Sequence, residues 1–442
     1  MTTYWCERAW LPNGVERGVL ISTNALGQIQ DMTTRTEHRT VQPDAHRLDG
    51  LVLAGFANAH SHAFHRALRG LTHFDGGTFW SWRTAMYELA DRLTPENYYE
   101  LARAGYAEMA VAGVTCVGEF HYVHHPVGGG RYPSANAMGE VLGEAARDAG
   151  IRLTLLDTCY LAGGIDLPLA PEQERFGDGS VAAWADRAAQ LSEMPGMRVG
   201  VAVHSVRAVP RADLPAVASA FPDRPLHVHL SEQPAENEAC LAAYGATPTE
   251  LLAEAGVLGE RTTAVHATHL STQDIRLLAE TGTGVCFCPT TEADLGDGIG
   301  PARELRDAGV PLSLGSDQHA VVDPLLEARA LEHGERLRSG QRGRLNPHEL
   351  LAALTTAGHR ALGWPTGGSL TRGAPADLVA IRLDSPRTAG CLPEQVLLAA
   401  TAADVHTVVA NGRVIARDGR HETLGDVGPA LADAIAALRD EV

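Results

Sequence analysis

Short apolar runs alternate with amphipathic stretches through the middle of the chain, at a spacing typical of strand–helix repeats. Most of the runs are continuously apolar, which is the pattern of parallel strands that are covered on both faces. We therefore expect one strand in each run. The eight runs are residues 51–59, 113–121, 151–159, 197–205, 225–231, 262–269, 284–290 and 310–317.

The stretches between the runs carry helix signals. Residues 94–113 begin with Thr94, a good N-cap, and Pro95 follows at the first helical position. Residues 133–150 and 271–282 each end in glycine, which commonly stops a helix. Eight strand–helix repeats predict an α/β fold, a closed (β/α)8 TIM-like barrel over residues 51–367. An open doubly wound sheet is the alternative, although no GxGxxG loop follows the first strand.

The two ends of the chain differ from the middle. Residues 1–50 and 368–442 contain short alternating strands with Gly, Asn-Gly and Asp-Gly turns. Neither end is long enough to bury a core by itself. We expect both ends to pair into one small, discontinuous β-sandwich domain beside the barrel.

The composition excludes several classes of protein. The net charge of −18 argues against nucleic acid or an anionic membrane as a partner. There is no run of 18 apolar residues and no signal-peptide pattern, so we expect a cytoplasmic protein. Seven scattered cysteines fit a reduced compartment, and Cys286 and Cys288 are expected to pack within a strand. The absence of lysine excludes a lysine Schiff base and a carboxylated lysine between two metal ions.

Side chains that commonly bind metal ions lie at the ends of the predicted strands. His60 and His62 follow the first run, and residues two apart on an extended chain point the same way. The C-terminal ends of barrel strands meet at one mouth, where barrel enzymes hold their catalytic groups. Three histidines and one carboxylate would bind Zn²⁺ and leave a position open for water. The candidates on later strands are His204, His229, His266 and Asp317.

The roles of other polar residues can be inferred from where they lie relative to these candidate metal ligands. Glu232 lies three residues after His229, just beyond the strand, so we expect it to act as a proton shuttle without being a ligand. His227 points the same way one layer deeper, and we interpret it as structural. Arg207 can form a bidentate clamp on a carboxylate, and with Tyr122 it favours an acidic substrate over a purine.

With these residues in place, the chain resembles the amidohydrolase superfamily over nearly its whole length. The likeness rests on "HSH" after the first strand, the histidines of the fifth and sixth strands, "GSD" after the eighth, and "GSLTRGAPADLV". The absence of lysine matches the mononuclear branch. Within the superfamily the chain is most similar to the formimidoylglutamate deiminases, through "FANAHSHAFHRALRG", "FWSWRTAMY", "GEFHYVHH", "VHSVRAV", "VHATHL" and "CPTTEADLGDGI".

This resemblance implies hydrolysis of N-formimino-L-glutamate, a small anionic amidine, to N-formyl-L-glutamate and ammonia in histidine degradation. It also implies one Zn²⁺ per chain, and Fe²⁺ or Mn²⁺ would accept the same ligands. A homodimer is common for such an architecture. Glu232, His266 and Asp317 would act in catalysis. The metal would be held by His60, His62, His229 and Asp317, and the substrate by His65, Arg83, Tyr122, His204 and Arg207.

One residue departs from the pattern of those enzymes. His65 stands where they usually have glutamine, and both side chains can donate a hydrogen bond. Two alternative functions remain. A deaminase of guanine or of an adenosine derivative would use the same metal site. A non-catalytic barrel that binds a ligand or a partner would belong to a different class.

Overall fold

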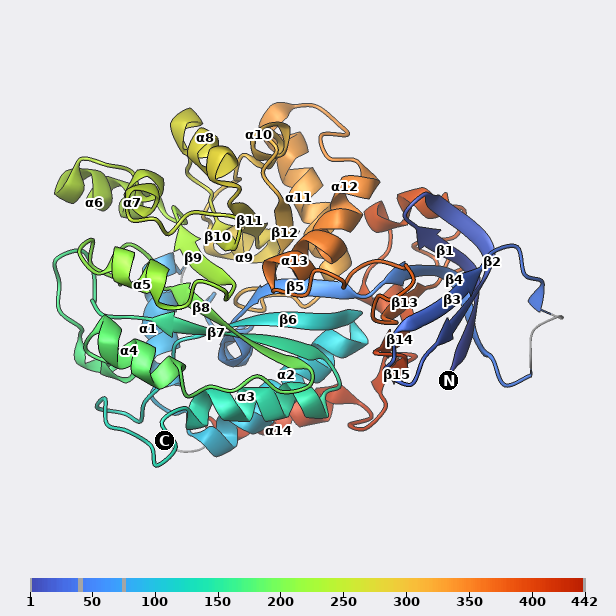
Figure 1. Ribbon diagram of the computed structural model, residues 1–442, viewed down its shortest axis with the longest axis horizontal. Helices are drawn as coiled ribbons and strands as arrows, with labels where there is room; N and C mark the ends of the chain where they lie inside the picture. Colours follow the sequence, from blue (N-terminus) through green and yellow to red (C-terminus); the bar gives the residue numbers. More distant parts are fainter. Residues whose placement is uncertain (1, 39–42, 74–76, 440–442) are drawn as a thin grey trace.

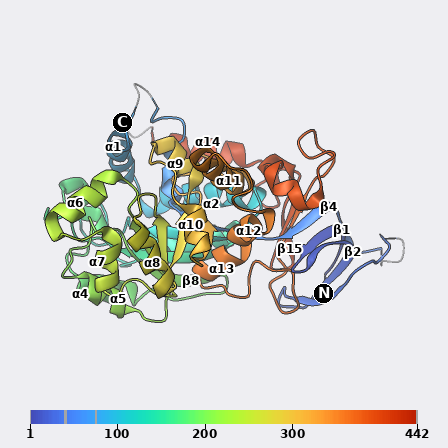
Figure 2. The same ribbon diagram turned by 90° about the horizontal axis from the view of Figure 1, so that it is seen from above.

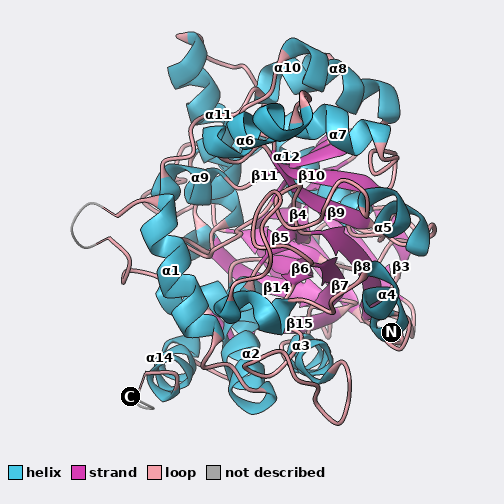
Figure 3. Ribbon diagram, turned by 90° about the vertical axis from the view of Figure 1, so that its left-hand side faces the viewer, coloured by secondary structure: helices cyan, strands magenta, loops and turns pink. Residues whose placement is uncertain are grey.

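The computed structural model describes residues 2–38, 43–73 and 77–439. Eight strands form one parallel sheet in chain order, and a parallel bridge between Ser61 and Asp317 brings its first and last strands together. The nearly closed (β/α)8 barrel confirms the predicted fold, and Figure 3 shows its strands at the centre with helices around them. The strands are β5 (Phe56–Ser61), β6 (Val114–His121), β7 (Arg152–Cys159), β8 (Met197–Val203), β9 (Leu226–Leu230), β10 (Thr262–His266), β11 (Gly284–Phe287) and β12 (Leu312–Leu314).

Helices between the strands cover the outside of the barrel (Figure 2). Thr94 caps α2 by accepting a hydrogen bond from the Asn97 amide, and Gly282 ends α8 in the left-handed region, as the sequence predicts. No helix among the described residues combines the length and the hydropathy needed to cross a bilayer. The α-helices of this part are α1 (Phe79–Ala90), α2 (Pro95–Val111), α3 (Ala137–Asp148), α4 (Val181–Ala188), α5 (Leu214–Ala220), α6 (Pro234–Tyr244), α7 (Pro248–Glu254), α8 (Thr272–Thr281), α9 (Pro289–Leu295), α10 (Ala302–Asp307), α11 (Pro324–Ser339), α12 (Pro347–Ala352) and α13 (Gly358–Ala361).

Strands from both ends of the chain form a separate mixed sheet, seen beside the barrel in Figure 1. Its order is β16-β15-β14-β13-β4-β1-β2-β3, and the antiparallel pair of β4 and β13 joins the two chain ends. Asn411 and Gly412 turn the chain between β14 and β15 in the left-handed conformation that Asn-Gly hairpins require. The strands are β1 (Thr3–Leu11), β2 (Gly14–Thr23), β3 (Ile29–Thr33), β4 (His46–Ala54), β13 (Leu378–Ile381), β14 (Val405–Ala410), β15 (Arg413–Arg417) and β16 (Arg420–His421).

Two segments lie on the other side of the expected domain boundaries. Residues 51–54, expected in the first barrel strand, belong to β4 of the mixed sheet. The chain crosses into the barrel at Gly55, where a Cβ would lie 2.3 Å from Thr115 Oγ1, so only glycine fits there. At the other end, α14 (Val427–Ala437) packs Val427 and Leu431 against α2 and thus covers the barrel, not the mixed sheet.

A buried ion pair joins the barrel to the mixed sheet. Arg152 on β7 is hydrogen-bonded to both carboxylate oxygens of Asp377, just before β13, and donates to Asn411 Oδ1 over 2.7 Å. Both members of the pair are almost fully buried. Because an unpaired charge would be costly there, the pair fixes how the sheet meets the base of β7.

Candidate metal centre and catalytic pocket

Four metal-binding side chains from distant parts of the chain converge at one end of the barrel. His60 comes from β5, His62 directly follows that strand, His229 comes from β9 and Asp317 from the loop after β12. One donor atom of each lies within 4.8 Å of the others. His60 Nε2 and His62 Nε2 are each 3.3 Å from Asp317 Oδ1, and His60 Nε2 is 3.1 Å from His229 Nε2. All four side chains are buried.

The hydrogen bonds behind these rings suit metal binding. His62 Nδ1 lies 2.9 Å from the Phe120 carbonyl oxygen, and His229 Nδ1 lies 3.0 Å from that of His204. A carbonyl oxygen can only accept, so each Nδ1 carries the proton and each Nε2 presents a lone pair. Two imidazoles in this tautomer beside a carboxylate therefore fit a divalent ion such as Zn²⁺.

Unusual backbone angles help to aim these groups into the barrel mouth. Ser231, His266 and Asp317 have φ of 49°, 68° and 42°, in the left-handed region that non-glycine residues rarely adopt. Ala267 and His319 share this conformation, so it recurs at the ends of three barrel strands. Such conformations cost about 1–3 kcal/mol each and gather at functional sites.

A buried network ties the two ligand-bearing segments together. Ser61, between His60 and His62, donates from Oγ to Glu119 Oε2 over 2.9 Å, and the same Oγ lies 2.8 Å from His319 Nε2. Glu119 Oε1 also accepts from the Ala63 amide at 2.7 Å. Burial raises the pKa of the Glu119 carboxyl to about 7. Sequence reasoning missed this network, although a charged residue inside a continuously apolar strand was a usable signal.

We expect Glu119→Gln to weaken zinc binding by about 10–100-fold, the range found when partners of metal ligands are altered. The amide cannot accept from both Ala63 and Ser61, so the backbone between the two histidine ligands loses one of its anchors. Competition with a chromophoric chelator measures the affinity. Glu100→Gln, at an exposed position of α2, is the matched control, and equal zinc affinities of the two variants would contradict the role of Glu119.

Two further side chains lie beside the four donors. Glu232 Oε1 is 3.7 Å from His266 Nε2, which in turn is 4.0 Å from Asp317 Oδ2. Burial raises the pKa of the Glu232 carboxyl above its ordinary value. A carboxyl whose affinity for a proton is raised, next to the donors but not among them, can take up and release a proton during a reaction.

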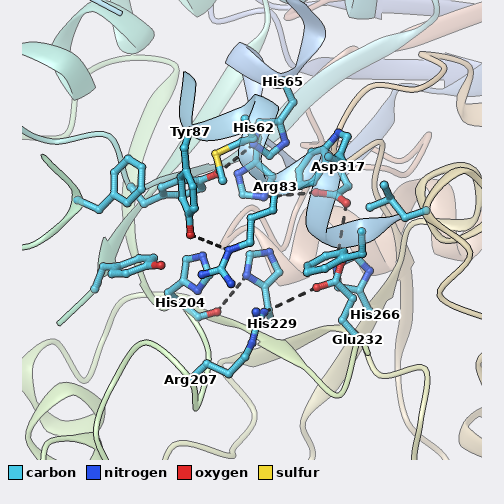
Figure 4. Close-up of a pocket in the computed structure, with 17 residues that line it drawn as sticks. His62, His65, Arg83, Tyr87, His204, Arg207, His229, Glu232, His266 and Asp317 are labelled. Carbon is cyan, nitrogen blue, oxygen red and sulfur yellow. Dashed lines mark hydrogen bonds and ion pairs between the residues drawn. The ribbon is translucent and has the colours of Figure 1, made fainter. Parts of the chain in front are cut away.

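Glu232 and His266 line one pocket together with three of the four donors, His62, His229 and Asp317. His65, Arg83, Tyr122, His204 and Arg207 form part of its wall, so the structure brings the expected substrate-binding residues to the same space. Figure 4 shows Tyr87 and His204 on one side of this pocket and Asp317, Glu232 and His266 on the other.

The two arginines of the wall differ in their partners. Arg207 Nε donates to the buried Glu236 Oε2 over 2.6 Å, and its Nη2 lies 3.9 Å from Glu232 Oε2. Arg83 Nε donates to the hydroxyl of Tyr87 over 2.6 Å, and no carboxylate pairs with Arg83 in the described part of the chain. Sequence reasoning missed Tyr87, although it lies four residues, one helical turn, after Arg83 in α1. It also missed Glu236 on α6, whose contact with Arg207 no local spacing indicates.

Histidine, aromatic and apolar side chains also line this wall. His65 Nε2 lies 2.9 Å from the Tyr122 hydroxyl, so the residue that departs from the family pattern contacts another expected substrate ligand. Burial lowers the pKa of the His204 imidazole. Aromatic and apolar side chains that the sequence did not single out complete the wall: Phe79, Trp82, Met86, Tyr160, Phe176 and Leu295.

Three residues interpreted as structural lie outside the wall. His227 is buried one layer down in β9, where its Nε2 lies 3.1 Å from the Ala361 carbonyl oxygen. Cys286 and Cys288 pack in a small buried cluster with Ala59 and Val265. Neither group belongs to the four-donor set.

Comparisons with known proteins identify the family of the chain. The model of the amidohydrolase family matches residues 51–415. The formimidoylglutamate deiminase of Pseudomonas aeruginosa is 37% identical over 444 residues, which cover 95% of this chain and 96% of that protein. The 8-oxoguanine deaminase of the same organism is 31% identical, with 87% and 86% covered. The crystal structure of an amidohydrolase from Brucella melitensis superposes with a TM-score of 0.92 at 33% identity, with 99% and 100% of the chains covered.

Proposed function

The chain belongs to the amidohydrolase family, and on this premise we propose that it is a zinc-dependent deaminase of N-formimino-L-glutamate. The products are N-formyl-L-glutamate and ammonia. Family membership and the four-donor group support hydrolytic deamination with a divalent metal. The choice of this substrate rests on the charged side chains of the pocket.

The observation that carries the proposal is the distribution of charge in the pocket. Arg83, which is half-buried, has no carboxylate partner in the described part of the chain, and an uncompensated guanidinium favours an anionic group nearby. Glu232 and Asp317, across the pocket, would attract a protonated amidine. N-formimino-L-glutamate carries two carboxylates and an amidine, so its charges match both sides, whereas a neutral purine matches neither.

The metal site would consist of His60, His62, His229 and Asp317. A bound Zn²⁺ lowers the pKa of a coordinated water from 15.7 to about 7 and so supplies a nucleophile at neutral pH. Nitrogen and oxygen donors without thiolate suit zinc, as they suit Fe²⁺ and Mn²⁺. The absence of lysine in the chain limits the site to one ion, because the bridge of a two-metal site of this kind is missing.

The residues around this site would act in the following order. Arg83, Arg207, Tyr122 and His204 hold the carboxylates, with His65 supporting Tyr122, so that the formimino carbon faces Asp317. Asp317 accepts a proton from the attacking water, and His266 donates a hydrogen bond at the same point. Glu232 carries a proton to the departing nitrogen, the C–N bond breaks, and ammonia leaves. The hydroxyl proton of the intermediate passes to Glu232, which has just given up its own, and the carbonyl of the formyl product forms.

A purine deaminase is the second candidate, favoured by the aromatic rings of Tyr160 and Phe176 in the wall and by the 31% identity with the 8-oxoguanine deaminase. Ammonia release from N-formimino-L-glutamate, guanine, 8-oxoguanine and adenosine separates the two. We expect kcat/KM for the amidine to exceed that for any purine by about 10⁴-fold, as in sites built for polar recognition. A purine that reacts faster would overturn the proposal.

We expect Arg207→Lys to lower kcat/KM for N-formimino-L-glutamate by about 10–100-fold, mainly through KM. Lysine keeps the charge but cannot bind Glu236 and a substrate carboxylate through one planar fork, and a charge-assisted hydrogen bond is worth about 1.5–3 kcal/mol. Steady-state kinetics measures the change. Arg211→Lys, at an exposed ion pair with Glu254, is the matched control. An unaltered KM in Arg207→Lys would contradict the role of Arg207 in binding a substrate carboxylate.

A further inference from the structure

A second group of buried metal-binding side chains lies next to the four-donor group. Glu232 after β9, His266 at the end of β10 and Asp297 after α9 each offer one atom, and these atoms lie within 4.8 Å of one another. All three side chains are at least nine-tenths buried. Glu232 and His266 serve the proposed reaction, but Asp297 has no part in it.

The loop after α9 holds Asp297 firmly in this place. The Asp297 amide donates to the Glu292 carbonyl over 2.9 Å, and His269 Nε2 lies 2.8 Å from the Asp297 carbonyl oxygen. Gly296 and Gly298 on either side adopt positive φ, which allows the tight turn. The backbone therefore presents the carboxylate toward the protein interior, where the side chain is 3% exposed.

One oxygen of Asp297 is unused. Oδ1 accepts from Gln233 Nε2, whereas Oδ2, although buried, has no hydrogen-bond partner among the described residues. A buried carboxylate oxygen without a donor is costly, because it has lost water and gained nothing in return. The group around it thus lacks a cation or a proton.

Charge in this region is unbalanced. Glu232, Asp297 and the buried Glu292 face His266, and Arg207, the nearest arginine to Glu232, is already bound to Glu236 over 2.6 Å. Burial, and then the Glu232 charge, raises the pKa of the Asp297 carboxyl to about 9. Against the effect of burial, the Glu232 charge also raises the pKa of the His266 imidazole, so a divalent ion must displace the protons that these side chains hold.

We propose that Glu232, His266 and Asp297 form a second divalent-cation site, which zinc in excess of the first ion occupies and thereby inhibits the enzyme. Two carboxylates and one imidazole are a donor set that Zn²⁺ accepts. The ion binds weakly, because it must displace a proton and draw the three groups together. The inhibition rests on the proposed function: a second ion occupies Glu232, which carries the proton, and His266, which orients the water.

Zinc titration of the enzyme that already holds one ion per chain tests the site without any substrate. We expect wild type to bind a second, weaker ion, and Asp297→Asn to lose at least tenfold of that affinity while it retains the first ion. Asp186→Asn removes an exposed carboxylate on α4 and should bind both ions as wild type does. Equal affinity of wild type and Asp297→Asn for the second ion, or no second ion in wild type, would contradict the proposal that these three residues form a cation site.

A kinetic arm tests the inhibition with the same variants. We expect excess zinc to lower kcat for N-formimino-L-glutamate in wild type, and the inhibition constant to rise at least tenfold in Asp297→Asn but not in Asp186→Asn. An unchanged constant would overturn the inhibitory role. If no ammonia is released from this substrate at all, the proposed function fails, whereas the titration still decides whether the second site exists.

Discussion

Glu232→Gln is expected to lower kcat for N-formimino-L-glutamate by about 10²–10⁴-fold, the range that a positioned acid–base group contributes. The amide has the size of the carboxyl and keeps contacts near His266 and Arg207, but it cannot carry a proton. Burial raises the pKa of the Glu232 carboxyl, so the native side chain holds a proton more readily than an exposed glutamate. Steady-state kinetics with a parallel zinc analysis measures the effect.

The controls for this variant separate proton transfer from structure. At one equivalent of zinc per chain, the zinc content should equal that of wild type, because Glu232 is not one of the four donors. KM should change little, since the carboxylate-binding arginines remain. Glu238→Gln, at an exposed position of α6, should retain full activity. Normal turnover in Glu232→Gln would show that another group moves the proton and would remove this role.

Asp317→Asn is expected to abolish turnover and to lose zinc as well. The carboxylate faces His60 Nε2 and His62 Nε2 at 3.3 Å, so its charge is central to the donor set. It is also the proposed acceptor of the proton from water. Loss of both roles predicts an effect at least as large as that of Glu232→Gln, accompanied by loss of the metal.

Thermal unfolding with and without zinc distinguishes these two variants. An ion that binds only the folded chain stabilises it by about 4 kcal/mol at a thousandfold excess over Kd. Added zinc should therefore raise the unfolding midpoint of wild type and of Glu232→Gln strongly, whereas in Asp317→Asn only the weaker second site remains and the rise should be much smaller. Asp307→Asn, at a surface ion pair, is the control. A zinc-dependent rise of the usual size in Asp317→Asn would exclude Asp317 as a ligand.

The barrel could be predicted because its strands are covered on both faces and so appear as continuous apolar runs. The same property hid the boundary near Gly55. Residues 51–54 and β5 are both fully buried, and no change of pattern marks the passage from the mixed sheet to the barrel. α14 was assigned to the wrong domain because an apolar helix face does not show which surface it will cover.

The donor set could be anticipated from chain position, since residues at strand ends in a barrel meet at one mouth. The contacts between individual side chains could not be anticipated in this way. The contact of Glu236 with Arg207 joins α6 to the loop after β8, and the link of Ser61 to His319 spans 258 residues. Asp297 is equally hidden, because its burial depends on a turn between two glycines whose conformation a sequence does not give.

Anomalous diffraction at the zinc edge, from crystals of the protein reconstituted with one equivalent of zinc, tests the central claim most directly. The account predicts one strong peak within bonding distance of His60 Nε2, His62 Nε2, His229 Nε2 and an Asp317 carboxylate oxygen. A peak elsewhere, or none at these four side chains in zinc-loaded crystals, would contradict it.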